Sequence, residues 1–285
     1  MNNIIEKIQY RFKSANIVEQ IIYINAAVFI LTYAINAIAF LMNFSEDLIF
    51  DWFSLPANFQ SFILKPWSLI SYGFLHGGFI HILFNLILLF YFGNLFLDFF
   101  SKKQFLNYYF LGIIVGGGVF ILSYSYLPGL KNEQTYLVGA SAGVTAILVG
   151  LATKVPNYAM HFRFIGAIKL WYIAVGFIIL DIVRIPLGVN TGGYLAHLGG
   201  ALIGFILTTQ FQNSKSSPSL FSTLFKSKKQ NPLKTVYKKS KPIANLQNDK
   251  NKQRKIDSIL DKISKSGYET LTKEEKDFLF SVGKK

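Results

Sequence analysis

The chain has 285 residues, of which 52% are hydrophobic and only 15% are charged, whereas about 25% are charged in ordinary soluble domains. This composition, with a mean hydropathy of +0.36, excludes a disordered protein, a collagen and a soluble basic nucleic-acid binder, and it indicates a membrane protein. The sequence contains no cysteine, which excludes disulfides, cysteine-ligated zinc, iron–sulfur clusters and a thiolate nucleophile.

The net charge of +14 is concentrated near the C-terminal end of the sequence. Residues 1–212 carry 11 basic and 8 acidic side chains, while residues 213–285 carry 18 basic and 7 acidic ones. The excess positive charge therefore belongs to a polar tail and does not indicate a nucleic-acid-binding core.

Six apolar stretches recur along the chain, of about the length that crosses a hydrocarbon core of ~30 Å. They are residues 21–42, 79–97, 105–127, 135–153, 164–185 and 192–211. Because helices satisfy all backbone polar groups in lipid, and because no barrel-like alternation is present, we predict an all-α, polytopic bundle of six transmembrane helices. We assign this core to residues 18–212, after an N-terminal segment of residues 1–17. The first span is too long for a signal-peptide core, so we expect it to be retained.

The distribution of lysine and arginine predicts the orientation of the spans. These residues gather in the N-terminal segment, in the second and fourth connections and in the tail, whereas the first connection, residues 43–67, is mainly acidic. The positive-inside rule then places both termini in the cytoplasm. The aromatic stretches of residues 43–67 are predicted to lie in the outer interface without spanning the membrane.

The tail divides into two parts. Residues 213–249 are predicted to be a basic disordered linker, since residues 213–241 hold eight lysines and no acid; we expect these lysines to bind anionic lipid and not nucleic acid. Residues 250–285 regain helical spacing, with Gly267 ending one helix and a capping box beginning the next at Thr272, which predicts a small cytoplasmic helical hairpin.

A serine lies in the fourth span, within Gly139-Ala140-Ser141-Ala142-Gly143. By itself this pattern is weak evidence for a nucleophile, because an α/β hydrolase would need a strand before it and a helix after it. The plain alternative is a small-residue motif that lets helices pack closely in the membrane.

Histidines lie in or next to two further spans. His197 shares one face of the sixth span with Gly200, while His76 precedes the second span and His81 and Asn85 lie near its start. Ionisable groups within spans are rare and usually functional, although a histidine can also simply bond to a backbone carbonyl. A zinc site is disfavoured, because even a helix extended back to His76 would put His76 and His81 on different faces, and no carboxylate is close in sequence.

The topology brings the three motifs to a common depth. The second, fourth and sixth spans all begin at the outer side, and His81, Ser141 and His197 each follow within a few residues. They therefore lie roughly 5–10 Å below the outer boundary. This shared depth favours a single site over three unrelated polar groups.

In order and spacing, these motifs resemble those of the rhomboid intramembrane serine proteases, over about residues 18–211. The resemblance implies that Ser141 is the nucleophile and His197 the general base, with His81 and Asn85 as oxyanion donors. It also implies supporting roles for Gly139, His76 and Gly200. A bacterial inner-membrane protein is implied, with transmembrane proteins as substrates, a site near the outer face and no cofactor or metal.

The sequence departs from the family pattern at Ser68, where many members have arginine, and at Thr145, where an aromatic residue is common. In the fifth span, Asp181 is three residues from Arg184, and we expect these two to form a local ion pair. No acid is then left to orient His197, so we predict a Ser–His dyad and not a triad.

Two other classes of protein compete with the protease interpretation. One is a catalytically inactive rhomboid-like protein that binds membrane clients, and the presence of both Ser141 and His197 argues against it. The other is a small transporter, which would continue its polar lining to the inner side, where these spans are largely apolar.

Overall fold

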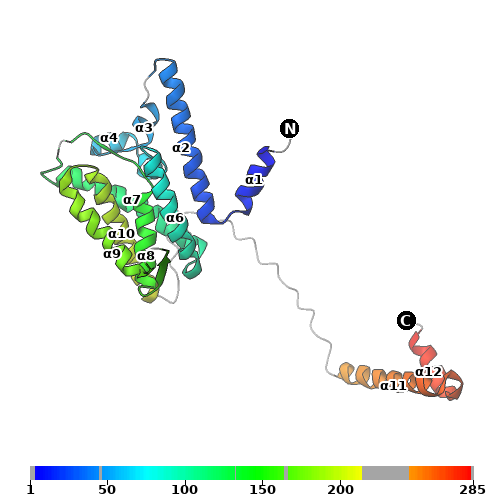
Figure 1. Cartoon of the computed structure of the whole chain (residues 1–285). Helices are drawn as coiled ribbons and strands as arrows, with labels where there is room; N and C mark the ends of the chain where they lie inside the picture. Colours follow the sequence, from blue (N-terminus) through cyan, green and yellow to red (C-terminus); the bar gives the residue numbers. More distant parts are fainter. Residues whose placement is uncertain (1–3, 45–46, 132, 164–165, 214–243, 284–285) are drawn as a thin grey trace. The chain divides into compact units, whose positions relative to one another are not determined.

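The computed structural model describes residues 4–44, 47–131, 133–163, 166–213 and 244–283. The chain divides into two compact units, Met1–Phe225 and Lys226–Lys285, and each is described by itself. The larger unit contains the predicted helical bundle (Figure 1).

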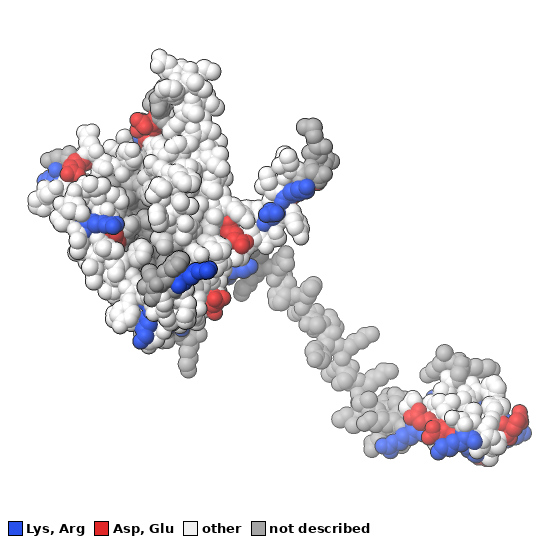
Figure 2. Space-filling view, viewed as in Figure 1, with Lys and Arg blue, Asp and Glu red and all other residues white. Residues whose placement is uncertain are grey.

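The bundle consists of five long helices and a shorter central one. These are α2 (Ile17–Leu41), α6 (Phe79–Phe99), α7 (Lys102–Tyr126), α8 (Ser141–Lys154), α9 (Leu170–Arg184) and α10 (Thr191–Asn213), preceded by α1 (Ile4–Ser14). In the part of the chain that the structure describes, five helical stretches are long and apolar enough to cross a membrane, which confirms a polytopic helical membrane protein. Charged residues are sparse on the visible face of the bundle (Figure 2), as a surface in contact with lipid requires.

The fourth predicted span, residues 135–153, is shorter than expected. Its first part is extended, because β2 (Tyr136–Leu137) pairs with β1 (Leu55–Pro56), and Gly139 has a φ of +124° that is incompatible with a helix. The helix α8 therefore has 14 residues, about 21 Å, against a hydrocarbon core of ~30 Å. Pairing with β1 supplies backbone hydrogen bonds that a helix would otherwise provide.

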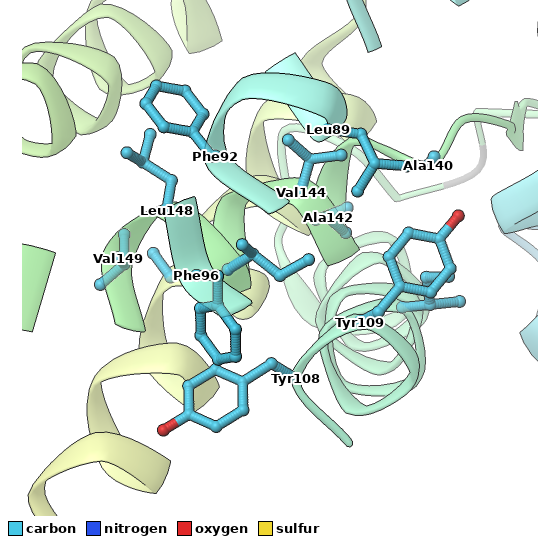
Figure 3. Close-up of a cluster of buried hydrophobic side chains, with 14 of the residues drawn as sticks. Leu89, Phe92, Phe96, Tyr108, Tyr109, Ala140, Ala142, Val144, Leu148 and Val149 are labelled. Carbon is cyan, nitrogen blue, oxygen red and sulfur yellow. The ribbon is translucent and has the colours of Figure 1, made fainter. Parts of the chain in front are cut away.

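Helix α8 forms the centre of the bundle. Every residue from Ala142 to Ala152 is buried, and α8 packs against α6, α7, α9 and α10. A helix that is apolar all round is stable in such a buried position. Figure 3 shows Val144 and Leu148 of α8 in the same cluster as the rings of Phe96 and Tyr108, whose centroids are 4.9 Å apart.

The fifth predicted span, residues 164–185, also begins later than expected. The chain first forms an antiparallel hairpin of β3 (Ala159–Phe162) and β4 (Gly166–Lys169), so that α9 begins at Leu170. The hairpin satisfies the backbone of this connection without extending the helix.

The first connection folds into short elements, none long enough to span a membrane. They are α3 (Leu48–Phe53), β1, α4 (Phe59–Leu64), α5 (Ser68–Ser71) and the 3₁₀ helix η1 (Tyr72–Phe74). Trp67 anchors this region, because its Nε1–H donates to the Trp52 carbonyl at 2.9 Å and the two rings stack. Ser68, the first departure from the family pattern, is buried next to Trp67 in the chain, and its Oγ has no hydrogen-bond partner among the residues that the structure describes.

In the second unit the structure describes α11 (Ala244–Ser266), η3 (Tyr268–Thr270) and α12 (Lys273–Gly283). Lys262 of α11 forms an ion pair with Glu275 of α12 at 2.8 Å, and the Thr272 and Glu275 side chains each accept from the other's backbone N–H. Residues 244–249 are helical, which corrects the linker predicted over 213–249; the rest of that linker, residues 214–243 with all eight lysines, lies outside the described residues.

Candidate active site

Ser141 is the first residue of α8, directly after the extended segment that contains Gly139. The Gly139 N–H donates to the Tyr72 carbonyl at 2.9 Å, which ties this segment to η1. A Cβ at position 139 would lie 2.7 Å from His81 Nε2, and the φ of +124° disfavours any side chain. Glycine is therefore required here both by the backbone and by the neighbouring imidazole.

His197 lies in the second turn of α10, facing an acid that the sequence analysis assigned elsewhere. Its Nδ1 is 3.1 Å from Oδ2 of Asp181 on α9, and the two side chains are 18% and 9% exposed. The expectation that no acid orients His197 is thus wrong. No ion pair between Asp181 and Arg184 exists among the described residues, because the Asp181 carboxylate faces α10.

This contact joins two helices, so it could not be found from spacing along one helix. The sequence nevertheless contained an indication of it. A carboxylate within a membrane span needs a partner from the bundle interior, and His197 was a candidate because the predicted topology put it at the same end of another span.

His81 and Asn85 lie one turn apart near the start of α6. The Asn85 Nδ2 donates one hydrogen to the His81 carbonyl at 2.9 Å, which orients the amide and leaves its second N–H available. The His76 ring packs edge-on against that of His81, with the two centroids 5.1 Å apart. Burial, and next the His81 ring, lowers the pKa of His76 to about 4, so this ring is neutral near pH 7.

Four of the predicted residues line one cavity of about 420 Å³ between α6, α8, α9 and α10. They are Ser141, His197, His81 and Asn85, and the cavity also includes Asp181. Its apolar part is lined by Phe84, Leu88, Phe92, Leu148 and Phe177. Ser141 and His197 form no hydrogen bond with each other in the part of the chain that the structure describes; such contacts often tighten only when substrate binds.

Gly200 explains how the base approaches the nucleophile. A Cβ at this position would lie 2.2 Å from the Ala142 carbonyl oxygen, and one at Gly204 would lie 2.3 Å from that of Ala146. The backbones of α10 and α8 are therefore in direct contact, as small residues permit in membrane bundles. His197, one turn before Gly200, is consequently held near the first turn of α8.

Thr145 stands on α8 where the family commonly has an aromatic residue, and the aromatic ring beside His197 comes instead from Tyr194 on α10. Thr145 donates to the Ser141 carbonyl at 2.8 Å, so it stays within its own helix. The ring that lies edge-on to His197 is that of Tyr194, with centroids 6.3 Å apart. The sequence analysis missed Tyr194, although its position three residues before His197 on one helix indicates contact.

These observations define a multi-pass helical membrane protein with a serine and an acid-paired histidine in one cavity. Within the described residues, no group of three histidine or acidic side chains lies close enough together to hold a metal ion.

Comparison with known families identifies the bundle. Residues 64–213 match the model of the Rhomboid domain, and the chain belongs to the rhomboid family. Residues 247–284 match a family of unknown function (DUF6576).

Two Arabidopsis thaliana proteins are similar to this chain. RHOMBOID-like protein 12, mitochondrial, is 25% identical over 210 residues, which cover 70% of this chain and 60% of that protein. RHOMBOID-like protein 4 is 31% identical over 145 residues, covering 50% of this chain and 33% of that protein. The match thus spans less than two thirds of either relative.

Proposed function

We propose that the protein is an intramembrane serine endopeptidase that hydrolyses peptide bonds in or near transmembrane segments of membrane proteins. The observation that carries this proposal is the common cavity that Ser141 and His197 line together with His81 and Asn85. A serine hydroxyl becomes an effective nucleophile only when a base can take its proton. His197 is the base that the cavity offers.

The reaction follows from these two groups. Ser141 Oγ adds to the substrate carbonyl carbon while its proton passes to His197 Nε2. When the tetrahedral intermediate collapses, the C–N bond breaks and the leaving amine takes that proton. Water then adds to the acyl ester and gives a proton to His197, which returns it to Ser141 Oγ as the carboxylic acid leaves.

Three donors are available for the oxyanion. The backbone N–H of Ser141 belongs to the first turn of α8, whose N–H groups have no partner within the helix. The His81 imidazole and the free N–H of Asn85 line the same cavity. Each donor of this kind contributes on the order of 2.7–4 kcal/mol of transition-state stabilisation.

Substrate access is assigned to the side of the cavity formed by α6 and α9. The apolar residues there suit a transmembrane segment, and α9 packs on α8 and α10. The preferred substrate is a single-span protein whose helix unwinds at small or helix-breaking residues, because hydrolysis needs an extended peptide. Movement of α9, together with the interfacial first connection, would admit it.

A bacterial inner membrane, which the resemblance to bacterial rhomboids implies, is part of the proposal, with both termini in the cytoplasm and the site near the outer face. The support for this orientation is the excess of lysine and arginine in the tail and in the second and fourth connections. The lysines of the tail would attract anionic lipid at about 1 kcal/mol each.

The test is covalent labelling of purified protein with a fluorophosphonate or isocoumarin probe, followed by peptide mass spectrometry. We expect the label on Ser141 and none on Ser141→Ala or His197→Ala; both variants also lose cleavage of a model transmembrane substrate. Ser125→Ala is the matched control, since Ser125 lies on α7 and donates to the Ile121 carbonyl. A folded wild type that neither labels nor cleaves, yet binds the substrate, would instead indicate a client-binding rhomboid-like protein.

A further inference from the structure

We infer that Asp181 is a positioning residue for His197, so that the site works as a Ser–His–Asp arrangement assembled from three helices. The inference rests on the proposed function and adds one residue to it. Among the described residues that line the cavity, Asp181 is the only acid, and the inference assigns it a role.

The first argument is the environment of the carboxylate. Asp181 lies within a membrane helix with its side chain only 9% exposed, and Nδ1 of His197 is 3.1 Å away. A buried carboxylate in a span is costly unless it is paired. Among the described residues the Asp181 side chain has no other hydrogen bond or ion pair, so His197 is the group that compensates this cost.

The second argument is the protonation pattern that the contact imposes. An ionised carboxylate can only accept hydrogen bonds, so the hydrogen between the two residues must be on Nδ1 of His197. The neutral ring then carries its lone pair on Nε2, the nitrogen that must take the Ser141 proton. When Nε2 is protonated, the carboxylate also stabilises the imidazolium that forms.

The third argument is that two other residues near His197, Tyr194 and Arg184, do not accept the hydrogen on Nδ1. Tyr194 is edge-on to His197 at 6.3 Å between ring centroids, so it can pack against the ring but not select a tautomer. Arg184 lines the same cavity, but a guanidinium has no acceptor for Nδ1–H. Asp181, whose Oδ2 lies 3.1 Å from Nδ1, is the acceptor that contacts this nitrogen among the described residues.

The experiment compares variants of the full-length protein in detergent. Asp181→Asn keeps the size of the side chain but lets its amide donate to Nδ1, which stabilises the wrong tautomer. We expect kcat on a model transmembrane substrate and the labelling rate of Ser141 to fall at least about tenfold, with KM within about twofold. Wild-type kcat and labelling in folded Asp181→Asn would overturn the inference, as would a change confined to KM.

A second variant keeps the inference testable if Asp181→Asn does not fold. Asp181→Ala leaves space beside Nδ1 in an accessible cavity, so added formate should restore part of the labelling rate. A purely structural role would not produce such rescue, and its absence in folded Asp181→Ala would count against the assignment. Acetamide, which has no carboxylate, is the matched additive and should not restore the rate.

Asp98→Asn is the matched control variant. Asp98 lies in the last turn of α6, whereas His81 lies in the first turn, roughly 25 Å away along the helix. The Asp98→Asn variant should therefore keep wild-type kcat. Wild-type labelling reports on the proposed function separately. If wild type does not label, the proposed function fails; if wild type and Asp181→Asn label equally, only the role of Asp181 fails.

Discussion

Asn85 shows how one side chain can be both anchored and available. Its Nδ2 is held by the His81 carbonyl at 2.9 Å, and the residue is 6% exposed. The hydrogen bond restricts the rotamers of the amide, and Asn85 lines the cavity that contains Ser141. A donor that is held in place before the reaction begins stabilises a developing charge without reorganisation.

We predict that Asn85→Ala slows turnover by roughly 10–1,000-fold, because one oxyanion donor of several is lost. His81→Ala should be at least as severe. Single-turnover cleavage rates on one model substrate measure the effect. Asn94→Ala is the control on the same helix, since Asn94 bonds to Asn16 and to the Phe90 carbonyl. A change in substrate affinity with unchanged chemistry would argue against the oxyanion assignment.

Among the elements, the contact between α8 and α10 sets the geometry of the site. Gly200 and Gly204 lie one turn apart on α10 and face the carbonyl oxygens of Ala142 and Ala146. Because a carbonyl in a buried helix cannot shift independently, a methyl group at these glycines must move a whole helix. Such a movement would carry His197 away from the first turn of α8.

We predict that Gly200→Ala destabilises the protein by about 1–3 kcal/mol and lowers the Ser141 labelling rate. The added Cβ would lie 2.2 Å from the Ala142 oxygen. Thermal unfolding in detergent and probe labelling give the two readouts. Gly118→Ala on α7 is the control, since nothing lies within 4 Å of its added Cβ, and it should be neutral or slightly stabilising. Equal behaviour of the two variants would contradict the close packing of α8 and α10.

At the scale of the whole molecule, the residues that we propose to be catalytic all belong to the first unit. His197 is separated from Asn213, where α10 ends, by 16 residues, or about 24 Å along the helix. The second unit matches a different family and carries many of the charges seen in Figure 2. Its two helices supply no residue to the described cavity.

We therefore predict that a variant ending at Asn213 cleaves a model substrate in detergent at close to the full-length rate. Its association with anionic liposomes should weaken, since the eight lysines of residues 213–241 are removed. Cleavage rates and liposome sedimentation of the two proteins decide this. A truncated protein that is folded but inactive would show that either the predicted topology or the site assignment is wrong.

The sequence alone was sufficient for the class of protein and for most of the cavity. Hydropathy identifies the helices because each span must satisfy its own backbone polar groups by hydrogen bonds within the helix. This requirement involves only about twenty consecutive residues. The polar residues Ser141, His197, His81 and Asn85 are conspicuous for the same reason, since a polar group in a span is costly. The common depth predicted for Ser141, His197 and His81 follows from the predicted topology together with the helix rise.

Only the tertiary structure decided where α8 begins and which acid faces His197. The start of α8 depends on Tyr136–Leu137 pairing with Leu55–Pro56, a contact between segments about eighty residues apart. The partner of Asp181 depends on how α9 and α10 pack, whereas spacing along the chain indicated Arg184. Both outcomes arise from contacts between elements, and hydropathy and helical periodicity describe only one element at a time.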